Sequence, residues 1–83
     1  MNPVRVACPE VLDQEAGRAL LGDVLAKRLG DGQTLVLDFQ NTRSMDSRGG
    51  AFIIELADHA RRRRAGFEIE GQDGEVAQFL DLV

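Results

Sequence analysis

The stretch Thr34-Leu-Val-Leu-Asp-Phe39 decides the fold of this 83-residue chain. Four of its six residues are apolar, with a glycine-containing turn before it and polar residues after it. A short apolar run with such borders predicts a central strand that is covered on both faces, as in a parallel sheet. Asp38 breaks the apolar character near the end of this strand, and that departure needs an explanation.

A strand and a helix are predicted before this central strand. Residues 4–8 show a short period-2 pattern, which predicts a strand that ends near Pro9. Asp13 is well placed to cap a helix that runs to about Leu29, and Gly30 is expected to follow as its terminating glycine. The face that this helix is expected to bury comprises Gly17, Leu20, Leu21, Val24, Leu25 and Leu29.

Three further elements are predicted after the central strand. Residues 40–44 are expected to form a loop, and a second helix follows from about Ser47 to Arg64, ended by Gly66. The next stretch, 67–70, alternates as a strand does, and the last stretch carries apolar residues at helical spacing. That last predicted helix covers residues 75–82. The buried side of the second helix is expected to comprise Ile53, Leu56, Ala57 and Ala60.

Strands and helices therefore alternate along the chain. This order favours an α/β fold with a small, mostly parallel or mixed sheet flanked by helices. A chain of 83 residues has room for one domain, so residues 1–83 are expected to form a single unit. In such sheets function gathers just beyond the carboxyl ends of the strands, which points to the segment after Phe39.

The composition excludes several classes of protein. A hydrophobic fraction of 43% is enough for a packed core, whereas a net charge of −4 disfavours a protein that must neutralise nucleic-acid phosphates. Cys8 is the only cysteine, so neither an intrachain disulfide nor a multi-cysteine zinc site can form. The longest apolar runs fall far short of the roughly 20 residues that span a bilayer, and the N-terminus lacks a signal-peptide pattern. We therefore expect a cytoplasmic protein that neither binds nucleic acid nor inserts into a membrane.

The segment Asp46-Ser-Arg-Gly-Gly50 lies where the loop meets the second helix. Two glycines at a helix start each cost about 1 kcal/mol of helix propensity relative to alanine, which is tolerated where the backbone must approach something closely. Free N–H groups and the helix dipole favour negative charge there, so a phosphate on Ser47 would be stabilised. The alternative is that Asp46 or Ser47 serves only as a helix cap.

Catalytic interpretations of this segment have less support. Ser47 lacks the G-x-S-x-G pattern of a nucleophile elbow, and the phosphate-binding pattern G-x-x-x-x-G-K is absent. The single histidine, His59, lies mid-helix, roughly 18 Å of helix rise from Ser47, too far for a local base. Asp38 and Asp46 offer only two carboxylates for a metal. We therefore expect a protein that is not an enzyme and that uses no metal or cofactor.

Several stretches together carry a resemblance to a known family. The strand Leu35-Val-Leu-Asp-Phe39, a polar loop and then Met45-Asp-Ser-Arg-Gly49 at a helix entry resemble the STAS domain. The most specific part is the Asp-Ser-x-Gly motif at the correct distance after a strand that contains an aspartate. The resemblance covers nearly the whole chain. Further matching stretches are Val11-Leu12-Asp13, Arg63-Arg-Ala-Gly-Phe67 and Phe79-Leu-Asp-Leu-Val83.

This resemblance implies a regulatory domain that binds another protein and catalyses nothing. In the anti-sigma factor antagonists of the family, a partner anti-sigma kinase phosphorylates the motif serine, and phosphorylation blocks the complex. By motif, Ser47 would be the phosphorylation site. The family also includes STAS modules of membrane transport systems, such as lipid ABC transporters and anion transporters, which dock on a permease without a phosphorylation cycle. We expect the partner-binding residues to be Asp46, Ser47, Arg48, Gly49 and Gly50.

The remaining charged and polar candidates have simpler interpretations. Arg61-Arg-Arg-Arg64 could form an anion site for lipid head groups, nucleic acid or an acidic partner. However, consecutive helical residues lie about 100° apart, so the four would fan around a helix end, where cations are favourable. The same interpretation fits Lys27 and Arg28 at the end of the first helix. Cys8 is expected to be a small buried hydrophobe and His59 a solvated helix residue.

Overall fold

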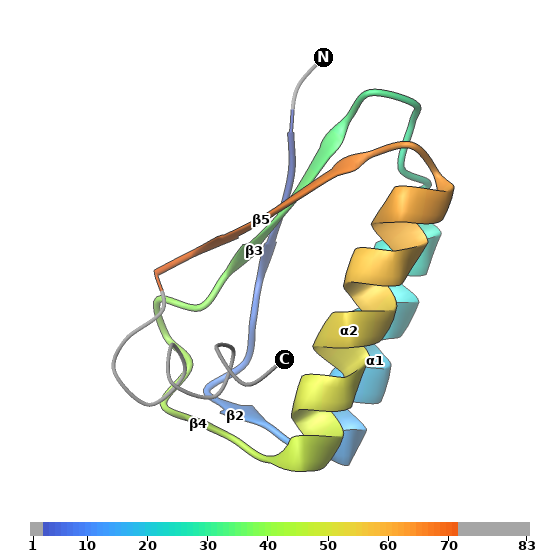
Figure 1. Cartoon of the computed structure of the whole chain (residues 1–83). Helices are drawn as coiled ribbons and strands as arrows, with labels where there is room; N and C mark the ends of the chain where they lie inside the picture. The colour runs from blue at the N-terminus through green and yellow to red at the C-terminus, as the bar shows by residue number, and fades with distance from the viewer. Residues whose placement is uncertain (1–2, 72–83) are drawn as a thin grey trace.

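The computed structural model describes residues 3–71 as a parallel sheet with two helices packed side by side on one face (Figure 1). The three long strands stand in the order β1-β3-β5, and both pairings are parallel. The expected α/β class and mostly parallel sheet are therefore confirmed, whereas the predicted helix at 75–82 lies outside the described residues. The elements are β1 Val4–Ala7, β2 Val11–Leu12, α1 Gln14–Ala26, β3 Thr34–Asp38, β4 Ser44–Met45, α2 Ser47–Arg62 and β5 Gly66–Glu70.

The core lies between the sheet and the two helices. On β3, the side chains of Leu35 and Leu37 point into it and are fully buried, as is Phe39 just after the strand. Alternate residues of β1 and β5 extend this layer, and one stripe of each helix covers it. As expected, Ile53, Leu56 and Ala60 supply the stripe of α2. Leu25 of α1 differs from the prediction, because it lies about 100° around the helix from the buried Val24 and is 49% exposed.

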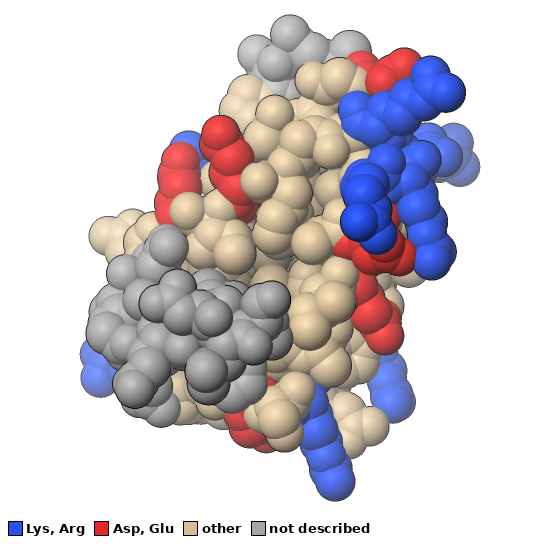
Figure 2. Space-filling view, viewed as in Figure 1, with Lys and Arg blue, Asp and Glu red and all other residues tan. Residues whose placement is uncertain are grey.

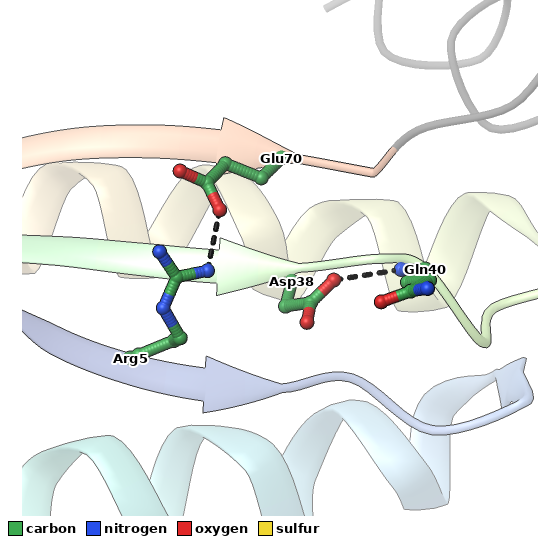
Figure 3. Close-up of polar contacts among 4 residues, drawn as sticks. All are labelled: Arg5, Asp38, Gln40 and Glu70. Atoms are coloured by element: carbon green, nitrogen blue, oxygen red, sulfur yellow. Dashed lines mark hydrogen bonds and ion pairs between the residues drawn. The ribbon is translucent and has the colours of Figure 1, made fainter.

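The outer face of the sheet explains why a polar residue ends the apolar run of β3. Both helices cover the opposite face, so Asp38 turns its carboxylate away from the core (Figure 3). One carboxylate oxygen accepts a hydrogen bond of 2.9 Å from the backbone N–H of Gln40 and so orders the turn after β3. On the same face Arg5 of β1 reaches across β3 to an ion pair with Glu70 of β5 (Figure 3). The hydrogen bond to Glu70 is the main cause that raises the pKa of Arg5.

Each helix is followed by an arginine in the left-handed conformation, where the sequence predicted a glycine. The helix α1 stops at Ala26, and Arg28 just beyond it has a φ of 51°. The helix α2 stops at Arg62, and Arg64 has a φ of 57°, while Gly66 already belongs to β5. Each arginine occupies the left-handed conformation that usually falls to a glycine after a helix. The sequence pattern misplaced both helix ends, because a glycine lies close to each end but does not occupy the left-handed position that follows the helix.

The segment 40–44, which was expected to be a loop, ends in a short strand. The two-residue strands β2 and β4 pair in parallel, with Val11 opposite Ser44 and Leu12 opposite Met45. The fully buried Thr42 adds a hydrogen bond of 2.7 Å from its hydroxyl to the carbonyl oxygen of residue 9. The connection after β3 is thus tied to the connection before α1. Because these connections lead into the two helices, their N-termini are held side by side at one end of the molecule (Figure 1).

Two glycines allow the helices to approach their neighbours closely. A Cβ atom on Gly49 would lie 1.9 Å from the carbonyl oxygen of Leu12, so the first turn of α2 rests directly on the backbone of β2. A Cβ atom on Gly17 of α1 would lie 2.4 Å from Cδ2 of Phe52 on α2. The close approach anticipated for the glycines of the motif is therefore an internal contact at Gly49, not a contact with a ligand.

We expect Gly49→Ala to destabilise the protein by about 3 kcal/mol, because its methyl group must displace the backbone of Leu12. Gly22→Ala is the matched control. Gly22 is an exposed residue inside α1 with no atom within 4 Å of its added Cβ, so alanine there should stabilise by about 0.5–1 kcal/mol. Urea unfolding followed by circular dichroism measures both. A Gly49→Ala variant as stable as Gly22→Ala would contradict this packing.

We also expect Arg64→Gly to be more stable than Arg64→Ala by about 1 kcal/mol, because only glycine relieves the left-handed backbone. Both variants remove the same charge, so their difference isolates the backbone effect. Thermal and urea unfolding provide the comparison. Equal stabilities would show that residue 64 is not held in this conformation in solution.

Candidate functional site

Asp46 makes the cap of α2 by itself. Its backbone is extended, with φ −107° and ψ 178°, and its Oδ1 accepts a hydrogen bond of 2.8 Å from the N–H of Gly49. Its carbonyl oxygen accepts the first helical bond, 2.9 Å from the N–H of Gly50. Its own N–H donates to the carbonyl oxygen of Leu12 at 3.3 Å. The cap interpretation therefore holds for Asp46, and the helix start does not need the hydroxyl of Ser47.

Ser47 presents an uncommitted hydroxyl at the start of α2. It is the first residue of the helix and is exposed, and its hydroxyl makes no hydrogen bond to any of the residues 3–71. The chain has no tyrosine, and its other hydroxyl residues are Thr34, Thr42 and Ser44. Thr34 and Ser44 are half-buried, and Thr42 is 1% exposed. Ser47 is thus the one exposed hydroxyl group of the chain.

The N-terminus of α1 lies beside this helix start and shares its polar surface. Asp13 caps α1 as predicted, with its Oδ1 accepting a hydrogen bond of 2.9 Å from the N–H of Ala16. Arg48 of α2 donates from Nη1 to Oε1 of Gln14 at 3.2 Å and so links the two helix starts. The contribution of α1 to the site was not predicted, because it depends on contacts between distant residues, such as the pairing of β2 with β4, that no local pattern indicates. A shallow hollow between them is lined by Asp13, Gln14, Glu15, Arg18, Asp46 and Arg48.

The five predicted partner-binding residues divide into two groups. Asp46, Ser47 and Arg48 are exposed, whereas Gly49 and Gly50 are buried against the interior. A partner that approaches the native surface therefore meets the first three side chains, and the glycines serve to seat the helix. The first turn of α2 contains no acidic residue. The carboxylate of the capping residue Asp46 is therefore the negative charge nearest to Ser47 along this helix.

The other predicted residues stand apart from this surface. Cys8 is buried as expected, and burial, followed by the charge of Asp38, raises the pKa of its thiol to about 12. His59 is not the solvated residue that was expected, since it is half-buried and its Nε2 has no hydrogen-bond partner in the described part of the chain. Within residues 3–71 no three His, Cys, Asp or Glu side chains gather to hold a metal, and neither helix is long and apolar enough to cross a membrane.

We expect Asp46→Ala and Ser47→Ala to differ sharply in stability. Loss of the cap should lower the free energy of unfolding by about 1 kcal/mol in Asp46→Ala. Loss of the free hydroxyl should change it by less than about 0.5 kcal/mol in Ser47→Ala, because no contact is removed. Urea denaturation of both variants measures these differences. A reversed order would assign the cap to Ser47.

The geometry therefore gives the two helix starts a rigid frame with one free hydroxyl group on its surface. Asp46 and Leu12 provide the frame, and Ser47 and Arg48 are exposed on it. Comparisons with family models, with curated proteins and with solved structures find no match to the chain.

Proposed function

We propose that this chain is a regulatory, non-enzymatic interaction domain of the STAS type. In this proposal it resembles an anti-sigma factor antagonist that binds a partner kinase through the start of α2 and is switched by phosphorylation of Ser47. The observation that carries the proposal is that Asp46 and Ser47, although neighbours, have different roles at the start of α2. Asp46 makes the cap, so Ser47 keeps an exposed hydroxyl that no contact within residues 3–71 occupies.

The position of Ser47 suits a phosphate acceptor. The Oγ atom would attack the γ-phosphorus of ATP held by the partner kinase, and the bond to the β–γ bridging oxygen would break as ADP leaves. The hydroxyl proton would pass to a base of the kinase. The chain itself supplies only the nucleophile and a rigid helix start that presents it.

A phosphate on Ser47 would change the surface without unfolding it. It would add about −1.5 to −2 units of charge at neutral pH, which the N-terminal end of the α2 dipole stabilises in the free protein. Within a complex the same charge would have to be desolvated beside Asp46, which weakens binding. The switch therefore follows from one charge that the free protein tolerates and the complex does not.

The switch can be tested on protein isolated from its own cells. We expect peptide mass spectrometry to find one phosphate on Ser47, absent in Ser47→Ala. Ser44→Ala is the matched control, since Ser44 is half-buried and its loss should leave the phosphate in place. Proteins that co-purify with the wild type should include an ATP-binding kinase, and Ser47→Asp should capture at least tenfold less of it.

Two outcomes would contradict this function. Phosphate retained in Ser47→Ala would place the modification elsewhere. Co-purification of a permease, equal for wild type and Ser47→Asp and without any phosphate, would assign the chain to the transport branch of the family. In that case the exposed start of α2 would be a permanent docking surface.

A further inference from the structure

The opposite end of the helix pair carries a concentration of positive charge. Six of the ten basic residues of the chain lie in the last turn of a helix or just after it. The other four basic residues are spread over the rest of the chain, which also holds most of the fourteen acidic residues. Figure 2 shows Lys and Arg side chains gathered at the upper right, over the C-terminal end of α2. We call this group the basic end. Its members are Lys27, Arg28, Arg61, Arg62, Arg63 and Arg64.

The basic end is a single surface because the two segments that form it contact each other. Nε of Arg63 donates to the carbonyl oxygen of Leu29 at 3.3 Å, and the N–H of Gly32 donates to the carbonyl oxygen of Arg64 at 3.0 Å. These bonds hold the connection after α1 against the connection after α2. The run lies at the C-terminus of α2 as expected, but the helix ends two residues earlier than predicted, so that Arg61 and Arg62 belong to its last turn and Arg63 and Arg64 follow it.

Intramolecular contacts account for only part of this charge. Asp58 pairs with both Arg61 and Arg62, and it is the only carboxylate within ion-pair distance of the basic end among residues 3–71. Arg28 and Arg64 also hold a left-handed backbone, where glycine would be more relaxed. The helix dipole favours positive charge near these helix ends. It does not explain why that charge stands at residues 28 and 64, where the left-handed backbone disfavours any side chain. The exposed positive charge that Asp58 does not pair is therefore available to an external anion.

We propose that the basic end binds the surface of an anionic lipid membrane. Clusters of four to eight Lys and Arg are attracted to anionic headgroups, and arginine matches phosphate geometry well. Leu25, in the last turn of α1, is 49% exposed and provides an apolar side chain beside the charges. Among residues 3–71 the phenylalanines are Phe39, Phe52 and Phe67, none of which belongs to the basic end. A stacking surface for single-stranded nucleic acid is therefore lacking there.

End-on binding would keep the switch surface clear of the membrane. Ser47 and Arg62 are the two ends of α2, about 22 Å apart along the helix axis. That separation exceeds the Debye length of about 8 Å at physiological salt, so Asp46 and a phosphate on Ser47 would feel little repulsion from the lipid. The inference is independent of the phosphorylation of Ser47, because it concerns the other end of the molecule.

Sedimentation of the full chain with vesicles tests the inference. We expect binding to phosphatidylcholine vesicles that contain phosphatidylserine, at least tenfold stronger than to phosphatidylcholine alone, and loss of binding as salt is raised. Arg28→Gln combined with Arg64→Gln should weaken it about ten- to thirtyfold. Arg18→Gln combined with Arg43→Gln removes the same charge outside the basic end and should bind like the wild type. Circular dichroism of both double variants should match the wild type.

Several results would overturn the inference. Equal binding to both kinds of vesicle, or equal weakening by the two double variants, would show that the basic end is not the contact. Tighter binding of duplex DNA or of polyglutamate than of anionic vesicles at the same salt would assign the basic end to those polyanions. Ser47→Ala should bind vesicles like the wild type, which separates a failure of this inference from a failure of the switch.

Discussion

The backbone of Leu12 is the constraint on which the rest of the structure depends. Its carbonyl oxygen accepts the N–H of Asp46 and lies where a side chain on Gly49 would have to go, while β2, which contains it, pairs with β4. These contacts bring together two connections that are distant in sequence. They fix the direction in which α2 leaves the sheet, and with it the orientation of Ser47. A surface built this way is rigid although it stands at a loop-to-helix junction.

The parallel order of the strands then separates two kinds of surface. Because β1, β3 and β5 run in the same direction, the helices that connect them also begin at one end and finish at the other (Figure 1). One end collects two caps and the N-terminal ends of two helix dipoles, and the other collects the carbonyl ends. The sequence follows this polarity, with the capping residues Asp13 and Asp46 at the first end and the six residues of the basic end at the second. The net charge of −4 is therefore distributed unevenly, with most of the positive charge at one end of the molecule.

The sequence predicted the features that depend on local pattern. The period of β1, the apolar run of β3 and the cap at Asp13 are all local, and the structure confirms them. For α2 the sequence left the cap open between Asp46 and Ser47, and the structure assigns it to Asp46. The missed features depend on contacts between distant residues. Nothing near Ser44 indicates that it pairs with Val11, and no pattern shows that Arg28 and Arg64 replace glycine where the helices end.

Gly49 and Gly50 both lower the helix propensity at the start of α2. From the sequence, their low helix propensity suggested that the backbone approaches a ligand or partner. In the structure, the approach at Gly49 is to Leu12, so packing already explains that glycine. Gly49 is therefore no longer support for a functional surface. The support comes from Ser47, because no packing contact explains its exposed hydroxyl group. Arg28 and Arg64 are the opposite case, because each holds a left-handed backbone while its side chain makes no hydrogen bond or ion pair to any other of residues 3–71. A strained residue that packing does not require is better support for an external ligand than one that packing explains.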